Sequence, residues 1–294
     1  MRYAYYPGCS LESTAKAYDL SLRAVFRLLG QELEEIDDWN CCGATAYMSV
    51  AETVALAVSA RNLALAERMG DLDVVAPCSA CFTVLNKTQR YLLGHAELRD
   101  RVQESLGEAG LSLTRPIRVR HPLDVLVNDV GLDVVVARAA RNLGGAKVAP
   151  YYGCQIVRPE RGFDDREVPM WLDVLFQRLG AEVVDYPPKV RCCGGMQMST
   201  NEQIGLRLNF DLLAEAMDSG ANVVVTTCPL CQINLEAYQD KISRAFKRKI
   251  RIPVMYFTQL LGLALGASPK ELGLPLNLVP FDVELAPVAE AVHG

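Results

Sequence analysis

The ten cysteines of this 294-residue chain fall into two sets of five, and both sets follow the same layout. Each set begins with a single cysteine, continues with an adjacent pair followed by glycine, and ends with a C-x-x-C motif. The intervals between these parts are 31 and 35 residues in the first set and 37 and 34 in the second. So many matching intervals indicate one sulfur-rich unit present twice. The sets are Cys9, Cys41, Cys42, Cys78 and Cys81, and then Cys154, Cys192, Cys193, Cys228 and Cys231.

The repeat extends beyond the cysteines. The stretch YYPGC at 5–9 matches YYGC at 151–154, and VVAPC at 74–78 matches VVTTC at 224–228. These matches cover the residues that immediately precede the first cysteine of each set and the first cysteine of each C-x-x-C motif. The flanking hydrophobic pattern is therefore duplicated together with the cysteines.

Short β-branched segments alternate with helical patterns, such as 44–69 and 202–218, in both copies. Such alternation implies parallel sheets with helices on their faces. We therefore predict an α/β fold of two homologous halves, each a small parallel sheet with flanking helices. The expected domains are residues 1–140 and residues 141–294, and the second ends in an irregular tail. The expected strands are 2–8, 32–36, 73–77, 117–120, 147–152, 181–185, 222–227 and 252–256.

The composition argues against several classes of partner and location. A net charge of −5 without a basic run argues against binding to nucleic acid or to an anionic membrane surface. No stretch of 18 consecutive apolar residues occurs, so we expect no membrane-spanning helix. The N-terminal sequence shows no secretory signal, which predicts a cytoplasmic location. In that reducing compartment, clustered cysteines serve more often as metal ligands or redox thiols than as structural disulfides.

The predicted topology brings the five cysteines of each half together. The single cysteine ends the first strand, the adjacent pair follows the second, and the C-x-x-C follows the third and opens a helix. Open α/β sheets bind their ligands at the carboxyl ends of parallel strands. The amide N–H groups and positive dipole end of a helix also favour thiolates. All five thiols are therefore expected at one end of each sheet.

Five thiolates suit few metal sites. A C-x-x-C alone is shared by zinc sites, redox thiol pairs and iron–sulfur clusters, and four thiolates complete a tetrahedral zinc site or a cubane [4Fe–4S] cluster. The adjacent pair converges only if the backbone turns sharply, and Gly43 and Gly194 permit the positive φ of such a turn. A polynuclear cluster with room for an extra thiolate accommodates all five sulfurs. One zinc ion per half with a spare cysteine, or a metal-free set of thiols, are the alternatives.

The doubled arrangement of a single cysteine, Cys-Cys-Gly and C-x-x-C resembles the CCG-domain family, and specifically the B-type subunit of heterodisulfide reductase. All ten cysteines match the pattern, and the resemblance spans about residues 2–265. The supporting stretches are YPGC at 6–9, DDWNCCG at 37–43, APYYGC at 149–154, CPLCQINLE at 228–236 and YFTQLL at 256–261.

The resemblance implies an oxidoreductase with two non-cubane [4Fe–4S] clusters, one held by each set of five cysteines. A disulfide would bind between the clusters and be cleaved homolytically, each sulfur being held by one cluster and then reduced. Electrons would come from an iron–sulfur subunit resembling heterodisulfide reductase C, which a flavoprotein resembling heterodisulfide reductase A would reduce. The family also implies an alternative, a non-catalytic electron-transfer subunit of a succinate, lactate or glycolate oxidoreductase. A structural zinc protein is the further alternative.

Three other residues are candidates for the site. His121 follows the fourth strand of the first half and could face the space between the halves, where it would deliver protons or contact substrate. Capping or packing is the other interpretation of this histidine. Lys16 and Arg158 closely follow the first cysteine of their sets, where a cation would hold an anionic substrate or offset cluster charge. A solvated charge is the alternative for both.

Overall fold

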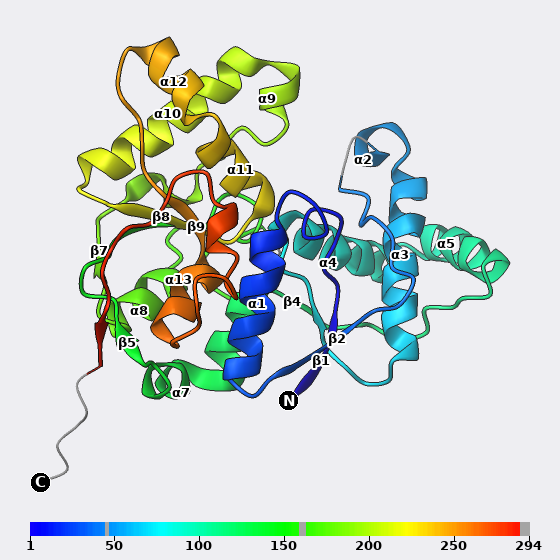
Figure 1. The fold of residues 1–294 in the computed structure, drawn as a ribbon. Coiled ribbons are helices and arrows are strands. Elements are labelled where there is room, and N and C mark those ends of the chain that lie inside the picture. Colours follow the sequence, from blue (N-terminus) through cyan, green and yellow to red (C-terminus); the bar gives the residue numbers. More distant parts are fainter. Residues whose placement is uncertain (45–46, 159–162, 289–294) are drawn as a thin grey trace, which may run out of the picture.

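The computed structural model describes residues 1–44, 47–158 and 163–288, and it contains two four-stranded parallel sheets (Figure 1). The strand order is β2-β1-β3-β4 in one sheet and β7-β6-β8-β9 in the other. The same order in both sheets confirms the predicted α/β fold of two homologous halves. We refer to residues 1–140 as the first half and to residues 141–294 as the second half. The strands are β1 (Arg2–Tyr5), β2 (Glu32–Glu35), β3 (Val74–Val75), β4 (Val119–Arg120), β5 (Arg141–Asn142), β6 (Lys147–Tyr151), β7 (Glu182–Val183), β8 (Val223–Thr226), β9 (Val254–Tyr256) and β10 (Ala286–Pro287).

The eight strands of the two parallel sheets all lie within the predicted segments. The central strand β8 is buried at every position, as expected for a parallel strand covered by helices on both faces. The edge strand β2 instead reads Glu-Leu-Glu-Glu and exposes its three glutamates. Charged side chains on an edge strand discourage pairing with another chain. Strand positions in the two sheets therefore follow from the local hydrophobic pattern.

Helices fill the segments between the strands. The predicted helix at 202–218 is confirmed as α10. No helix within the described ranges is long and apolar enough to cross a bilayer. The helices are α1 (Lys16–Leu28), α2 (Tyr47–Val50), α3 (Glu52–Arg68), α4 (Ser79–Gly94), α5 (Ala96–Glu108), α6 (Pro122–Val125), the π-helical η1 (Leu126–Gly131), α7 (Leu132–Ala137), α8 (Trp171–Arg178), the 3-10 turn η2 (Pro187–Val190), α9 (Gln197–Thr200), α10 (Glu202–Asp218), α11 (Pro229–Ala237), α12 (Gln239–Phe246), α13 (Phe257–Ala264) and the 3-10 turn η3 (Leu274–Leu276).

The helical pattern predicted over 44–69 forms two helices, α2 and α3, with a break between them, and residues 45 and 46 lie outside the described residues. Ala51 at the break has φ −147° and ψ 72°, and its carbonyl accepts the N–H of Ala55 (3.0 Å) at the start of α3. Helix α3 lies close to the loop of the first cysteine pair. A Cβ added at Gly43 would lie 3.1 Å from the Ala55 carbonyl.

The two halves exchange contacts between their first and last helices. Helix α13 of the second half packs against α1 of the first half, beside it in Figure 1. The rings of Tyr18 and Tyr256 stack there with centroids 4.4 Å apart. Buried residues of α6 and α7 from the first half belong to the same hydrophobic core as those of α8, and Arg178 on α8 forms an ion pair with Asp133 on α7. Both halves therefore contribute to one core.

The tail after α13 packs irregularly on the second half. Strand β10 pairs in antiparallel orientation with β5. The side-chain amide of Asn277 donates to the Val254 carbonyl (3.1 Å), and the N–H of Val279 donates to the Glu236 carboxylate (3.3 Å). Up to residue 288, this segment therefore makes specific contacts with its own chain.

Candidate functional site

The cysteines of both sets lie where parallel strands end, as the topology predicts. In the first half, Cys9 follows β1, the adjacent pair follows β2, and Cys78 precedes α4 directly after β3. In the second half, Cys154 follows β6, the adjacent pair follows η2, and Cys228 precedes α11 after β8. All ten cysteines are free thiols. The fold therefore gathers each set at one end of its sheet.

The thiols of the first set form a continuous strip. The thiol of Cys41 lies close enough to that of Cys42 to shift its pKa, and Cys42 stands in the same relation to Cys81. Cys81 in turn interacts with Cys78. The exposed Cys9 lies close enough to contribute to the raised pKa of Cys41. One end of this strip is therefore exposed, and the other is buried.

The second set repeats the strip with all five thiols in direct sequence. The thiol of Cys154 lies close enough to that of Cys192 to shift its pKa, and Cys192 interacts in the same way with Cys193. The sulfur of Cys193 lies 3.5 Å from that of Cys231, which contacts Cys228. The exposed and buried ends of the strip correspond to those of the first set.

The two strips meet at their buried ends, because the thiols of Cys78 and Cys228 lie close enough to shift each other's pKa across the boundary between the halves. Within the described part of the chain, no three cysteine, histidine or carboxylate side chains are grouped as ligands of one metal ion. Five thiols are one more than a tetrahedral zinc ion or a cubane [4Fe–4S] cluster takes.

Interactions between neighbouring thiols lower the pKa of some members of each set and raise that of others. Chiefly the neighbouring Cys41 lowers the pKa of Cys42 to about 4, and chiefly the neighbouring Cys154 lowers the pKa of Cys192 to about 2. The same interactions raise the pKa of Cys41 and Cys154. Thiolate is the form of cysteine that binds metals. Each set therefore offers the soft, electron-rich ligands that iron–sulfur clusters and zinc prefer.

A tyrosine in each half holds the loop of the adjacent cysteine pair. The hydroxyl of Tyr6 donates to the Asn40 carbonyl, and that of Tyr151 donates to the Arg191 carbonyl, both at 2.7 Å. Each carbonyl belongs to the residue immediately before the pair. Burial raises the pKa of both hydroxyls, so both remain donors. Each tyrosine stands three residues before the first cysteine of its set, a sequence signal that the predicted site omits.

A glycine before the first cysteine of each set lets the chain pass close to the C-x-x-C. Gly8 has φ 72° and Gly153 has φ 69°. A Cβ added at these positions would lie 3.1 Å from the sulfur of Cys81 or Cys231, respectively. The glycines after the two adjacent pairs also have positive φ, 80° and 88°, as predicted for the turns there.

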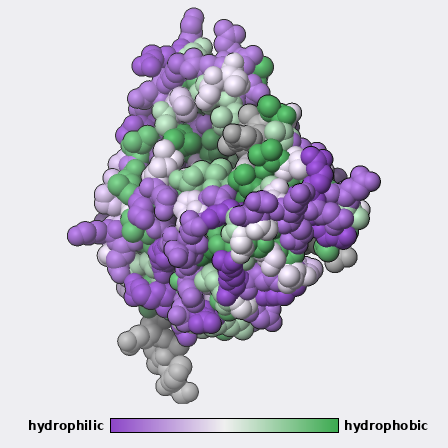
Figure 2. Space-filling model, turned by 90° about the vertical axis from the view of Figure 1, so that its right-hand side faces the viewer, coloured by the Kyte–Doolittle hydropathy of each residue, from purple (hydrophilic) through white to green (hydrophobic). Residues whose placement is uncertain are grey.

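The first set is bordered by exposed apolar side chains. Val50 on α2 and Val54 on α3 are 83% and 50% exposed. Figure 2 shows the face on the right-hand side of Figure 1. This face is largely hydrophilic, and apolar residues gather in its upper middle. Because α3 also packs on the loop of the adjacent pair at Gly43, this apolar surface lies beside that loop.

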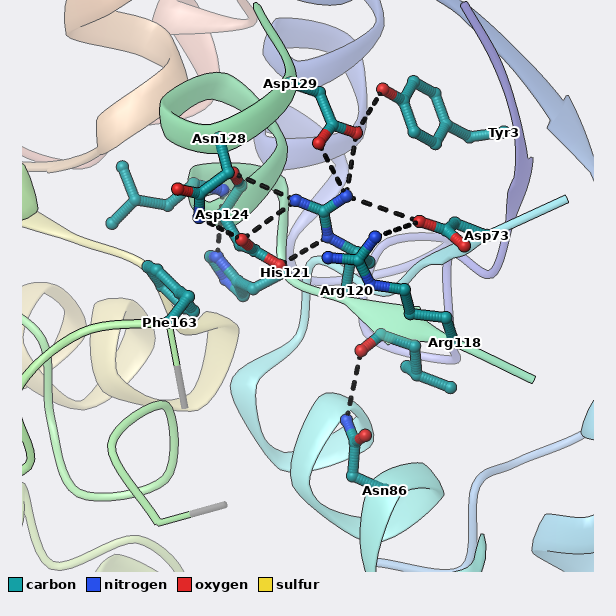
Figure 3. A network of polar contacts seen from close by, with 12 residues as sticks. Tyr3, Asp73, Asn86, Arg118, Arg120, His121, Asp124, Asn128, Asp129 and Phe163 are labelled. Atoms are coloured by element: carbon teal, nitrogen blue, oxygen red, sulfur yellow. Dashed lines mark hydrogen bonds and ion pairs between the residues drawn. The ribbon is translucent and has the colours of Figure 1, made fainter. Parts of the chain in front are cut away.

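His121 lies buried between the halves. Its Nδ1 accepts the N–H of Leu123 (3.2 Å) and so caps α6. The ring proton is therefore on Nε2, which donates to the carbonyls of Pro77 (3.1 Å) and Thr227 (3.4 Å). Burial lowers the pKa of His121 to about 4, so the imidazole is neutral at neutral pH. Figure 3 shows the ring facing Phe163. Both nitrogens are thus engaged with backbone groups.

Arg120 anchors the strand that leads to His121. Its side chain is 1% exposed. The guanidinium binds the carboxylates of Asp124, Asp129 and Asp73 at 2.9, 2.7 and 3.3 Å (Figure 3). Because these carboxylates lie on α6, on η1 and before β3, the network joins β4 to three neighbouring segments.

The two predicted cations differ in their surroundings. The Nε of Arg158 donates to the Cys154 carbonyl (3.1 Å), and the charge of Arg158 helps to lower the pKa of Cys192. The Nζ of Lys16 instead pairs with Asp19 within α1 (2.8 Å). Arg158 is therefore the cation that the structure places beside its thiol set.

Comparison with known proteins agrees with the duplicated geometry. The cysteine-rich CCG domain matches residues 3–86 and 148–236, which make up more than half of the chain and contain all ten cysteines. The chain belongs to the CCG family.

Full-length relatives of this CCG protein include components of heterodisulfide reductases. The 8-methylmenaquinol:fumarate reductase membrane anchor subunit of Wolinella succinogenes is 36% identical over 94% of this chain and 96% of its own. A protein of Archaeoglobus profundus that is named as similar to the B-type subunit of heterodisulfide reductase is 31% identical over 92% of this chain and 93% of its own. The B-type subunit of the ferredoxin/F420H2-dependent CoB-CoM heterodisulfide reductase of Methanosarcina acetivorans is 29% identical over 100% of this chain and 99% of its own. The CCG protein is thus a relative of the B-type subunit of heterodisulfide reductase.

A solved structure supports the fold alone. The crystal structure of a hypothetical protein from Helicobacter pylori superimposes with a TM-score of 0.77 at 15% identity, covering 95% of this chain. The CCG protein spans about half of the length of that structure, 52%.

Proposed function

We propose that this CCG protein is the disulfide- and thiol-handling subunit of a heterodisulfide reductase-like complex. Residues 1–140 and 141–294 form its two domains, and each set of five cysteines holds one non-cubane [4Fe–4S] cluster. The observation that carries the proposal is the contact between Cys78 and Cys228, by which two equivalent thiol strips meet at one boundary. The relatives named after the B-type subunit of heterodisulfide reductase support it independently.

The stoichiometry of the reaction matches the duplication. Reducing a disulfide consumes two electrons and two protons and releases two thiols. Iron–sulfur clusters, when bound, supply electrons one at a time, so two sets at one boundary provide one electron for each sulfur. The protein itself contributes ten sulfur ligands, and Tyr6 and Tyr151 fix the loops of the two adjacent pairs among them. Arg158 provides a cation for an anionic arm of the substrate.

Protons reach the product thiols from solvent in this proposal. His121 is completely buried, and both of its ring nitrogens contact backbone groups. The first cysteine of each set lies at the outer end of its strip, where Cys9 is exposed and Cys154 is partly exposed. Water can therefore approach the outer ends of the strips, whereas the buried ends are shielded.

The complex requires a source of electrons. We propose an iron–sulfur subunit resembling heterodisulfide reductase C as the direct donor, and a flavoprotein resembling heterodisulfide reductase A behind it. The chain is then an oxidoreductase that acts on sulfur groups only within this assembly.

Metal analysis of anaerobically purified protein tests the cofactor. About eight iron and about eight sulfide per chain are expected for two [4Fe–4S] clusters. Cys42→Ser and Cys193→Ser should each lose about half of the iron, because each affects its own set. About two zinc per chain without sulfide would overturn the proposal, since one zinc ion would then occupy each set.

Electron paramagnetic resonance tests the reaction. The oxidised protein should give a new cluster signal when a thiol product is added, and the signal should broaden with a thiol enriched in ³³S. Candidate disulfides should be consumed when the reduced iron–sulfur partner is supplied. Protein that carries iron but gives neither response would contradict the disulfide-handling role.

A second candidate function is electron transfer without sulfur chemistry. It is favoured by the 36% identity to the membrane anchor subunit of a fumarate reductase, which exceeds the identity to both heterodisulfide reductase relatives described above. Protein that exchanges electrons with a partner flavoprotein while leaving a range of disulfides intact would support this candidate over the first.

A further inference from the structure

The two C-x-x-C loops are joined by a single imidazole. Nε2 of His121 faces the carbonyl of Pro77 at 3.1 Å and that of Thr227 at 3.4 Å. These residues immediately precede Cys78 and Cys228, whose thiols contact each other. One donor on the first half therefore contacts both loops at the point where the thiol strips meet.

Two further donors from the first half converge on the same carbonyl. The hydroxyls of Tyr18 and Ser79 donate to the Thr227 carbonyl at 3.3 and 3.2 Å. The Thr227 hydroxyl donates to the Tyr152 carbonyl within the second half (3.3 Å). The loop before Cys228 is thereby held by three groups from the other half.

The ring of His121 is fixed as well as its nitrogens. The residue is completely buried. Phe163 stacks on the imidazole with centroids 6.3 Å apart and an interplanar angle of 5°, and Phe82 and Phe257 lie 6.0 Å away. The aromatic neighbours and the helix cap leave the ring one orientation, in which Nε2 points at both loops.

The internal repeat provides no second copy of this contact among the described residues. Tyr18 and Phe163 both stand nine residues after the first cysteine of their sets. Tyr18 stacks on Tyr256, whereas Phe163 stacks on His121. Tyr256, which corresponds to His121, directs its hydroxyl to Gln232 (3.4 Å). The imidazole therefore breaks the symmetry of the repeat at the boundary between the halves.

We propose that His121 is a positioning residue that fixes the Cys78 loop against the Cys228 loop and so sets the separation of the two cysteine sets. This inference rests on the proposed function, because the separation matters when each set holds a redox centre. A disulfide shared by two centres needs each sulfur within reach of its own centre. A change of a fraction of an ångström at the loops would alter that reach without removing any ligand.

The test measures the magnetic dipolar coupling between the two centres by pulsed electron paramagnetic resonance, after iron has been quantified in each protein. His121→Phe keeps an aromatic ring among the same neighbours but removes both Nε2 hydrogen bonds to the loops and the bond that Nδ1 accepts from the Leu123 N–H. His121→Gln keeps an N–H donor at a similar distance from the backbone. His95→Phe is the matched control, because His95 is exposed and lies between α4 and α5.

We expect His121→Phe to retain its iron and to show weaker and more broadly distributed coupling than wild type. His121→Gln should restore the coupling in large part, and His95→Phe should leave it unchanged. Unchanged coupling in iron-loaded His121→Phe would overturn the inference. If His121→Phe does not fold, His121→Leu replaces it, because it also removes both Nε2 hydrogen bonds, and unchanged coupling in iron-loaded His121→Leu overturns the inference equally. Wild-type protein without iron would instead refute the proposed function.

Discussion

Replacing Arg120 with methionine should destabilise the protein far more than replacing Arg118, two positions earlier. The side chains of Arg120 and Asp124 are 1% and 11% exposed, so the substitution leaves a buried carboxylate without its cation. Asp129 and Asp73 are 19% and 28% exposed and are more readily hydrated. Removing one partner of a buried ion pair costs about 3–5 kcal/mol, and hydration of the outer carboxylates places Arg120→Met near the lower end of that range.

Arg118→Met is the matched control, because the Arg118 side chain is 65% exposed and contacts Asp73 at 3.4 Å. Exposed ion pairs contribute about 0–1 kcal/mol. Guanidinium titrations of anaerobic protein would measure the free energy of unfolding of each variant. Adding Asp124→Asn to Arg120→Met should recover about 1 kcal/mol, because residues in contact couple by about 0.5–3 kcal/mol. Equal losses for the two arginine variants would refute the reasoning from buried charge.

Two further predictions concern a close approach and a buried carboxyl. Gly8→Ala should reduce the iron content of the first set, because the added Cβ would lie 3.1 Å from the Cys81 sulfur. Gly110→Ala is the control, because Gly110 has a similar φ of 65° but open space around it. This variant shares the backbone cost of about 1–2 kcal/mol and should keep its iron. Equal iron losses would contradict this. Burial raises the pKa of Glu236 despite the hydrogen bonds that it accepts, so the stability from its neutral form is lost as pH rises through the folded pKa. Glu236→Gln should therefore gain stability relative to wild type as pH rises above the ordinary glutamate pKa of about 4.3, and a difference in unfolding free energy that stays constant with pH would argue against it.

Local and repeated features of the sequence predict most of the framework. The strands follow from short β-branched runs, and the thiols lie at the strand ends because the cysteines directly follow those runs. The positive φ of Gly43 and Gly194 was expected from the sharp turn that adjacent cysteines require. These features depend on neighbouring residues, so one copy of the repeat contains enough information to predict them.

Contacts between distant segments could not be predicted in this way. The contact between Cys78 and Cys228 depends on how the two halves dock, which hydrophobic periodicity does not encode. The same holds for His121, whose Nε2 partners lie in loops of both halves. The break at Ala51 was also missed, because the helical pattern continues through it.

The packing of the last helices of each half against the other half resembles an isologous dimer, in which both protomers use the same surface at the interface. A fragment ending at residue 140 would lack α13 and would leave the facing surface of α1 uncovered. A second copy of the fragment, supplying its own α6 and α7, could cover such a surface by the same reciprocal arrangement. Joining the copies in one polypeptide fixes their ratio at one to one, so neither sulfur-rich end is synthesised without its counterpart.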